Sequence, residues 1–329
     1  MLIVSGWDIM GNIVVAIIGA QDYGNKLGKK GTSTDITLYN LKKGEDTVTF
    51  IEPTRYPERL APLFYTVALA KKAIVVADKL DTVLGESLVM LQCSNIKSGY
   101  FVLRNYIPKE KIQLLIKGTN LENFEFVNDD PNQIREKLLS DASHQKPSET
   151  QQTFGIVPVD HAFNVKGVGV VVLGIVISGV IAKHATLNAL PASKTTVVRS
   201  IQKHDDEFDI ATEGDRVGLA LKNIEVENVG RGTVLTNEPS IKIAKILKTQ
   251  AALVKYWQTP IKEGMVMHIG HWTQFLTARV DSIAETGDPQ KQVLSLTLDK
   301  PLIYCSNDKA VLMYLEGAKL RIAGTLELK

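Results

Sequence analysis

Unbroken apolar runs in the first 140 residues predict strands that are covered on both faces. The runs lie at residues 13–19 (IVVAIIG), 73–77 (AIVVA) and 100–103 (YFVL). Such runs are typical of parallel sheets, in which helices bury both sides of each strand. Helix-like segments separate them, at residues 59–72, 85–95 and 133–139. This alternation predicts an α/β domain.

The pattern changes after residue 152. Short segments rich in Val, Ile and Thr recur between Gly, Asn and Asp turns, which is typical of β-barrels or sandwiches. A polar stretch with a proline at residues 142–152 is the best linker, and a second boundary lies near residues 237–239. The one helix-like pattern in this half covers residues 244–250. We therefore expect domains at residues 1–145, 153–238 and 241–329.

Two apolar stretches are candidates for a membrane-spanning helix or a signal peptide. Residues 168–182 number 15 and contain three glycines, whereas a spanning helix needs about 18 or more apolar residues. Because Val and Ile favour strands, we interpret this stretch as two buried strands. Residues 1–20 lack a basic start and contain Asp8, which argues against a signal peptide. With Cys93 and Cys305 interpreted as reduced thiols, we expect a cytoplasmic protein without a membrane partner.

Charge adds one observation. The formal net charge of +2 is too small to indicate a nucleic-acid partner by itself. Residues 241–329, however, carry 12 basic and 8 acidic side chains. The excess includes Lys242, Lys245, Lys248, Lys255 and Lys262. Either these lysines form a solvated face, or they form a surface for RNA phosphates.

Several segments resemble a known family. Residues 160–169 (DHAFNVKGVG), 195–202 (TTVVRSIQ), 204–206 (HDD), 214–221 (GDRVGLAL) and 230–235 (GRGTVL) follow one another in the order of domain 2 in translational GTPases of the EF-Tu and SelB family. Residues 319–326 (KLRIAGTL) resemble the closing strand of domain 3. Residues 28–37 (GKKGTSTDIT) resemble archaeal SelB-like factors, including a factor linked to pyrrolysine, near their first switch. The resemblance implies an α/β P-loop GTPase-like domain followed by two β-barrel domains.

A GTPase domain needs a phosphate-binding loop, G-x-x-x-x-G-K-[ST]. Its amides and Lys hold phosphate, and its hydroxyl holds Mg²⁺. Gly19 and Gly24 keep the spacing, but Asn25 stands at the Lys position and Lys26 at the Ser or Thr position. The helix after the loop is shortened as well. The resemblance thus implies a degenerate nucleotide-binding loop at Gly19, Asp22, Gly24, Asn25 and Lys26.

Two further family motifs have lost groups that they need. The D-x-x-G-H motif matches residues 52–56 (EPTRY), where Arg55 replaces the Gly and Tyr56 replaces the His. The guanine motif [NT]-K-x-D matches residues 104–107 (RNYI), where Ile107 replaces the carboxylate. We therefore expect a pseudo-GTPase with no cofactor, no metal and no catalytic residue. The alternative is an active enzyme with divergent motifs that binds GTP or GDP with Mg²⁺.

Domain 2 keeps its family pattern better. In SelB-like proteins a pocket in this domain holds the aminoacyl end of the tRNA, and the matching positions here are Asp160, His161, Phe163 and Arg216. His161 stands where the family has Arg, which argues against selenocysteine as the cargo. The resemblance implies aminoacyl-tRNA and the ribosome as partners, and not DNA. A regulatory partner of a translation complex is a third interpretation.

Purely structural roles stay open as alternatives for several residues. Arg216 could pair with an acid and brace the barrel instead of lining a pocket. Residues 230–232 (GRG) are expected to form a turn shaped by chain geometry. His268 and His271 lie three residues apart in an expected strand, so they point to opposite faces and do not form a metal pair.

Overall fold

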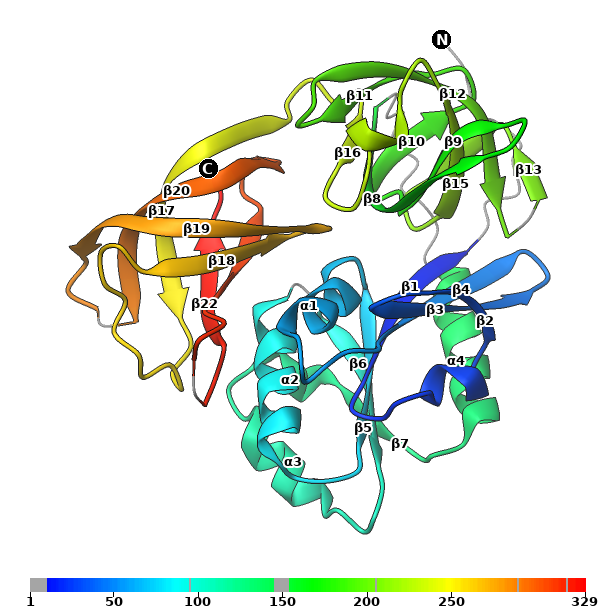
Figure 1. Ribbon diagram of the computed structural model, residues 1–329. Helices are drawn as coiled ribbons and strands as arrows, with labels where there is room; N and C mark the ends of the chain where they lie inside the picture. The colour runs from blue at the N-terminus through cyan, green and yellow to red at the C-terminus, as the bar shows by residue number, and fades with distance from the viewer. Residues whose placement is uncertain (1–10, 95, 145–153, 205, 289, 318) are drawn as a thin grey trace.

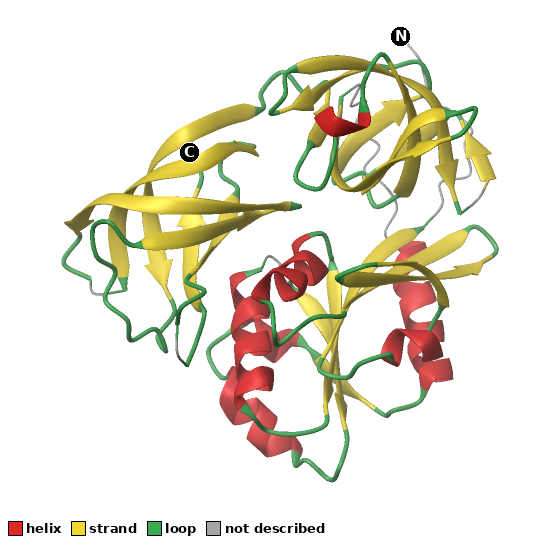
Figure 2. Cartoon of the chain, in the orientation of Figure 1, coloured by secondary structure: helices red, strands yellow, loops and turns green. Residues whose placement is uncertain are grey.

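The computed structural model describes residues 11–94, 96–144, 154–204, 206–288, 290–317 and 319–329. Within them lie one α/β domain and two β domains (Figure 1), which confirms the expected fold class. Helices are concentrated in the first domain, and strands make up nearly all of the other two (Figure 2). Residues 1–10, Asp205 and residues 145–152 of the expected linker lie outside the described residues.

The first domain is built on a seven-stranded sheet with the order β2-β3-β4-β1-β5-β6-β7. The pairs β1–β4, β1–β5, β5–β6 and β6–β7 are parallel, and β2–β3 and β3–β4 are antiparallel. The strands span Asn12–Ile18 (β1), Lys29–Ser33 (β2), Ile36–Lys43 (β3), Asp46–Pro53 (β4), Lys72–Ala77 (β5), Ser98–Leu103 (β6) and Glu125–Val127 (β7). The three predicted apolar runs are β1, β5 and β6, as expected of strands buried on both faces.

Helices cover both faces of this sheet (Figure 1). They span Leu60–Ala68 (α1), Thr82–Cys93 (α2), Lys109–Ile116 (α3) and Pro131–His144 (α4). Three short 3₁₀ helices span Tyr23–Lys26 (η1), Asn120–Asn123 (η2) and Val226–Asn228 (η3). In β1, Ala16 and Ile18 join the core beneath α1 and α2, whereas Ile13 and Val15 join the core beneath α4. This alternation explains why the whole strand is apolar.

Two predicted helices of the first domain have different ends in the structure, and one further helix was not predicted. The helix expected over residues 59–72 ends at Ala68, because Lys72 already belongs to β5 and pairs with Asp141. The helix expected over residues 133–139 continues to His144 as α4, so residues 142–144 are helical and not part of a linker. Helix α3 was not predicted, because it is a polar helix that buries only Ile112 and Ile116.

The second domain is a barrel. Its strands follow the order β8-β16-β11-β12-β15-β9, and β9 also pairs with β8, so these six close on themselves. The strands of the domain span Gly155–Val165 (β8), Gly169–Ile175 (β9), Ser178–Ala182 (β10), Thr186–Leu190 (β11), Lys194–Lys203 (β12), Asp206–Phe208 (β13), Ile210–Thr212 (β14), Arg216–Lys222 (β15) and Val234–Thr236 (β16). The apolar stretch 168–182 forms β9 and β10, as predicted. In the described residues, no helix combines the length and apolar character that crossing a membrane requires.

The third domain is a closed barrel with the strand order β17-β20-β19-β18-β21-β22. The strands span Lys242–Leu253 (β17), Val266–His271 (β18), Gln274–Glu285 (β19), Lys291–Tyr304 (β20), Lys309–Met313 (β21) and Ile322–Glu327 (β22). The helix expected over residues 244–250 is wrong, because this segment is the middle of β17. A bulge between Ala244 and Ile246 interrupts its alternation and imitates helical spacing.

The third barrel shares an apolar core with α1 and α2. Val254, Val311, Met313 and Ile322 of the barrel pack with residues of both helices. Gly270 lies directly against the ring of Phe64, where a Cβ atom would come within 2.5 Å of the ring. At the edge of this core, Arg321 donates two guanidinium bonds to Glu86 of α2. The first and third domains are thus continuous in packing.

Polar contacts join the first domain to the second. Asn12 donates to Asp215, which is also bound by Lys203 at 3.1 Å. Lys71 pairs with Glu213 at 3.1 Å at the edge of the same interface. These contacts place the start of β1 and the residue before β5 against the turn between β14 and β15 of the second barrel.

Candidate functional site

The loop after β1 is the position that the sequence analysis assigned to phosphate. Gly19 has a φ of 101°, and a Cβ there would lie 2.1 Å from the carbonyl oxygen of Val76, so only glycine fits. The short helix η1 follows at Tyr23–Lys26, and β2 begins three residues later. The shortening expected from the sequence is therefore present, and the loop passes directly into an edge strand.

The Glu52 carboxylate fills the hydrogen-bonding positions of this loop. Its two oxygens accept from the backbone amides of Asp22 and Gly24, the latter at 2.9 Å. Glu52 is the second-last residue of β4 and is 4% exposed. Burial raises the pKa of Glu52 above its ordinary value, although the two amide bonds act in the opposite direction. The loop thus carries an anion of its own chain.

Asn25 and Lys26 lie outside this contact. Asn25 is exposed and donates to the Asp22 side chain at 3.3 Å. The Lys26 ammonium lies 5.6 Å from the centroid of the Tyr23 ring. The five predicted loop residues therefore lie together, but only the amides of Asp22 and Gly24 converge on an anion.

A second self-contained cluster lies beside the loop. The Tyr23 hydroxyl donates to Asp129 at 2.8 Å, and Arg104 donates to the same carboxylate at 2.7 Å. The Arg104 guanidinium also lies 5.0 Å from the Tyr23 ring centroid. Although burial alone would raise the pKa of Asp129, the bonds from Arg104 and Tyr23 lower it. Arg104 is the first residue of the segment that resembles the guanine motif. Its guanidinium is already paired with Asp129.

A cleft of about 310 Å³ adjoins the loop at the ends of β1, β4 and β5. Glu52 forms one wall, and Asp78, Asp81 and Ser87 lie on the others. No group of three or more His, Cys, Asp or Glu side chains able to hold a metal ion occurs in the described part of the chain. His268 and His271, both on β18, do not belong to any such group.

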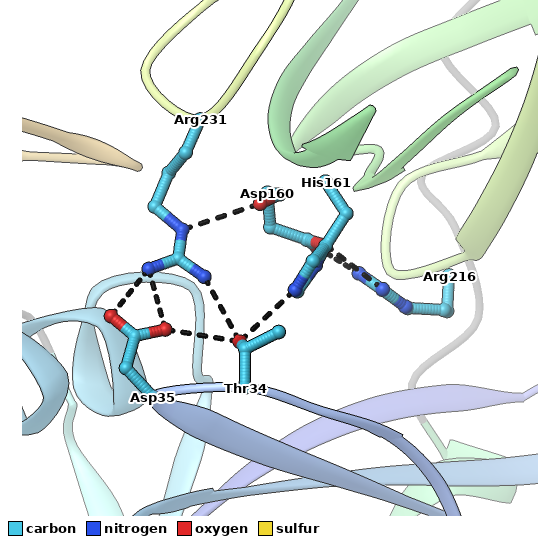
Figure 3. A network of polar contacts seen from close by, with 6 residues as sticks. All are labelled: Thr34, Asp35, Asp160, His161, Arg216 and Arg231. Atoms are coloured by element: carbon cyan, nitrogen blue, oxygen red, sulfur yellow. Dashed lines mark hydrogen bonds and ion pairs between the residues drawn. The ribbon is translucent and has the colours of Figure 1, made fainter. Parts of the chain in front are cut away.

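In the second barrel, three of the four predicted pocket residues meet (Figure 3). Arg216 donates to both oxygens of Asp160, with one bond at 3.0 Å, and the two side chains are 12% and 4% exposed. His161 Nδ1 bonds to the same carboxylate. Burial would raise the pKa of Asp160, but the charges and hydrogen bonds of Arg216 and His161 together outweigh it, so the pKa is lowered. Phe163 lies apart, 42% exposed on β8.

Arg231 has a role that was not predicted from the sequence. It lies in the expected turn, yet its guanidinium donates to both oxygens of Asp35, at 2.7 and 2.6 Å (Figure 3). Its Nε donates to the backbone oxygen of Asp160 at 3.2 Å. His161 Nε2 meets the Thr34 hydroxyl at 3.1 Å. Residues 34–35 therefore lie over the Asp160–His161–Arg216 cluster. In the sequence, the one feature that pointed to Arg231 was its position between two glycines.

Comparisons with known proteins agree with this architecture. The sequence model of elongation factor Tu domain 2 matches residues 169–236. An uncharacterized protein of Methanocaldococcus jannaschii is 37% identical over 97% of this chain and 100% of its own length. The selenocysteine-specific elongation factor of the same organism is 24% identical over 78% of this chain, which spans 58% of that factor.

A solved structure extends the likeness to the whole fold. The crystal structure of elongation factor SelB from Methanococcus maripaludis, in complex with the GTP analogue GppNHp, superposes with a TM-score of 0.80 at 20% identity, covering 97% of this chain and 79% of that one. Together with the domain 2 match and the order of the three domains, these findings show that the chain belongs to the translational GTPase family, close to the SelB-like factors.

Proposed function

We propose that this chain is a translation factor that binds an aminoacyl-tRNA or the ribosome without a bound guanine nucleotide. The observation that carries the proposal is the Glu52 carboxylate on the amides of Asp22 and Gly24. A phosphate would have to displace a buried anion that already satisfies these donors, and it would meet like charge. Lys26 offers no hydroxyl for Mg²⁺.

The neighbouring cluster supports the same proposal. Reading guanine requires a free carboxylate, and Ile107 offers none. Asp129, an acid close to this segment, is held by Arg104 and Tyr23. A guanine ring would have to break this pairing, so this cluster offers the base no carboxylate that is already free.

For the cargo, we propose that Asp160, His161, Phe163 and Arg216 border a site for the aminoacylated 3′ end of a tRNA. The Asp160–Arg216 pair fixes His161, and the exposed ring of Phe163 offers a stacking surface. Because Arg216 is neutralised by Asp160, the cluster has no spare positive charge for a selenolate. The cargo is therefore an amino acid other than selenocysteine, and the factor acts in the cytoplasm.

The first half of β17 supplies a surface for the tRNA backbone. Lys242, Lys245 and Lys248 are exposed there, and they alternate along the strand with Ile243 and Ile246, which are 48% and 71% exposed. Basic side chains that neutralise phosphates release counterions, so binding weakens as salt rises. Replacing all three lysines with Gln is expected to lower the affinity for tRNA. The slope of log affinity against log salt concentration should also become less steep, by an amount that corresponds to about three phosphate contacts at most.

Two measurements test the proposal. Sequencing of RNA that co-purifies with the native protein, followed by titration with charged and uncharged tRNA, should show binding that GTP does not change. A fluorescent GTP analogue with Mg²⁺ should bind weakly or not at all. Guanine-selective binding at micromolar concentration would instead favour the rival function, an active GTPase, for which the 310 Å³ cleft is the available space. If the protein carries no RNA and binds none, the regulatory interpretation replaces ours.

A further inference from the structure

The end of β4 contacts two separate segments, the loop after β1 and residues 34–35. Glu52 holds the amides of Asp22 and Gly24 in the loop after β1. Two residues later, the Thr54 amide donates to the carbonyl of Asp35 at 2.9 Å, and its hydroxyl donates to the carbonyl of Thr34 at 2.7 Å. One tripeptide therefore positions both the loop and residues 34–35.

Residues 34–35 in turn hold the second barrel. Asp35 accepts both bonds from Arg231, and the side chains of this pair are only 27% and 21% exposed. The Arg231 guanidinium also lies 4.6 Å from the ring centroid of Tyr65 on α1. A partly buried ion pair in which one guanidinium nitrogen donates to both carboxylate oxygens, and whose guanidinium lies over an aromatic ring, is a specific contact and not a solvated surface pair. Burial opposes the charge of Asp35, but Arg231 lowers its pKa, so the pair is ionised near neutral pH.

The loop and the docking segment also touch through β3. A Cβ placed on Gly24 would lie 2.2 Å from the Tyr39 ring, so the loop backbone rests on that ring. Tyr39 is buried in β3, the strand that follows Asp35 directly. A shift of the loop would therefore displace the strand that carries the docking segment.

We propose that Glu52 is a built-in anion that fixes the loop after β1 and, through Thr54, holds Thr34 and Asp35 where Arg231 docks. The docking of the second barrel on the first domain then requires no nucleotide. This inference deepens the proposed function, since it rests on the loop being occupied by the chain itself. It concerns domain geometry, however, and its test contains no RNA.

The choice of variant follows from the two amide bonds. Glu52→Gln keeps the volume of the side chain but replaces one acceptor oxygen with an NH₂ donor, so one of the two amides loses its partner. The matched control is Glu45→Gln, because Glu45 is exposed in the turn between β3 and β4. Thr54→Val removes the bond to Thr34 and leaves the Glu52 contact intact.

Hydrogen–deuterium exchange on the nucleotide-free protein provides the test. In Glu52→Gln, exchange is expected to rise about tenfold, the equivalent of one lost hydrogen bond, in residues 19–28, 29–37 and 228–236. Thr54→Val should raise exchange in the second and third segments but not in the first. Glu45→Gln should change none of them.

Other outcomes overturn the inference. If Glu52→Gln speeds exchange in residues 19–28 alone, Glu52 orders only its own loop. If no segment changes, the carboxylate is dispensable. Should Glu52→Gln fail to fold, Thr54→Val carries the decision, and unchanged exchange around Arg231 in that variant rejects the relay. Protection of residues 19–28 of the parent protein by GTP would contradict the proposed function separately, whatever the variants show.

Discussion

Replacing Arg216 with alanine would remove the main partner of a carboxylate that is almost wholly buried. Asp160 is 4% exposed in its side chain and would keep only His161. Removing one partner of a buried ion pair typically costs about 3–5 kcal/mol, because an uncompensated charge remains. The residual bond from His161 places the expected loss near the lower end, at about 3 kcal/mol. Arg216→Lys keeps the charge but loses the second bond, and should cost about 1.5 kcal/mol.

Urea denaturation followed by circular dichroism measures these losses. With an m-value of about 2 kcal/mol per M, Arg216→Ala should lower the midpoint of the transition by about 1.5 M. Arg199 provides the control, because it is exposed on the same barrel and Arg199→Ala should cost less than about 0.5 kcal/mol. A loss below about 1 kcal/mol for Arg216→Ala would refute the reasoning that this pair braces the barrel.

The pH dependence gives a second check on the same pair. In the parent protein the pKa of Asp160 is lowered, so the stability it contributes is present above the unfolded pKa of about 3.9 and is lost as pH falls through the folded pKa. Without Arg216, burial dominates and the pKa of Asp160 rises. The deficit of Arg216→Ala should therefore be largest at neutral pH and disappear on acidification, as Asp160 becomes neutral. A deficit that is independent of pH would mean that lost packing, and not charge, is responsible.

Three further outcomes are expected. Glu86→Gln should destabilise the protein by about 1.5–3 kcal/mol in thermal unfolding, because it weakens the bidentate contact with Arg321, and a loss like that of an exposed pair would contradict this. Gly24→Ala should cost about 1–3 kcal/mol, because its Cβ would collide with the Tyr39 ring, and Tyr39→Ala should relieve part of that cost when combined with it. Burial raises the pKa of Cys93 to about 12, so thiol reagents should leave Cys93 unmodified in the folded protein at pH 8, and rapid labelling detected by mass spectrometry would overturn this.

Periodicity predicted the buried strands well and failed where the local pattern was ambiguous. The runs at β1, β5 and β6 are apolar because both faces are covered, so sequence and structure carry the same information. In β17 the bulge near Ala244 shifts the alternation by one residue, and the strand acquires a spacing typical of a helix. In α3 only Ile112 and Ile116 are buried, which is too weak a pattern for a short polar segment.

The candidate site shows a similar division. Gly19, Gly24 and the missing groups at Asn25 and Lys26 are visible in the sequence, because a phosphate loop has fixed spacing. That Glu52 would bond to this loop could not be predicted, since 28 residues separate it from Gly24 and only the sheet brings them together.

Ion pairs of domain 2 residues could not be predicted for the same reason, because their partners are far apart in the sequence. The contact between Arg231 and Asp35 joins residues 196 positions apart, so no local pattern announces it. The choice between a pocket and a brace for Arg216 also depended on such a contact. The structure shows the ion pair with Asp160, and both the brace and the pocket stay predictions for its role.

The core shared by α1, α2 and the third barrel has a consequence during synthesis. The helices are complete when Cys93 has left the ribosome, but Val254, Val311, Met313 and Ile322, which cover them, are made much later. About 230 residues separate Cys93 from Ile322, and at about 5–20 residues per second their translation takes about 10–45 s. For that interval, the outer apolar face of the nascent first domain has no intramolecular cover. Shortened versions that end before residue 254 should therefore expose this apolar face and aggregate.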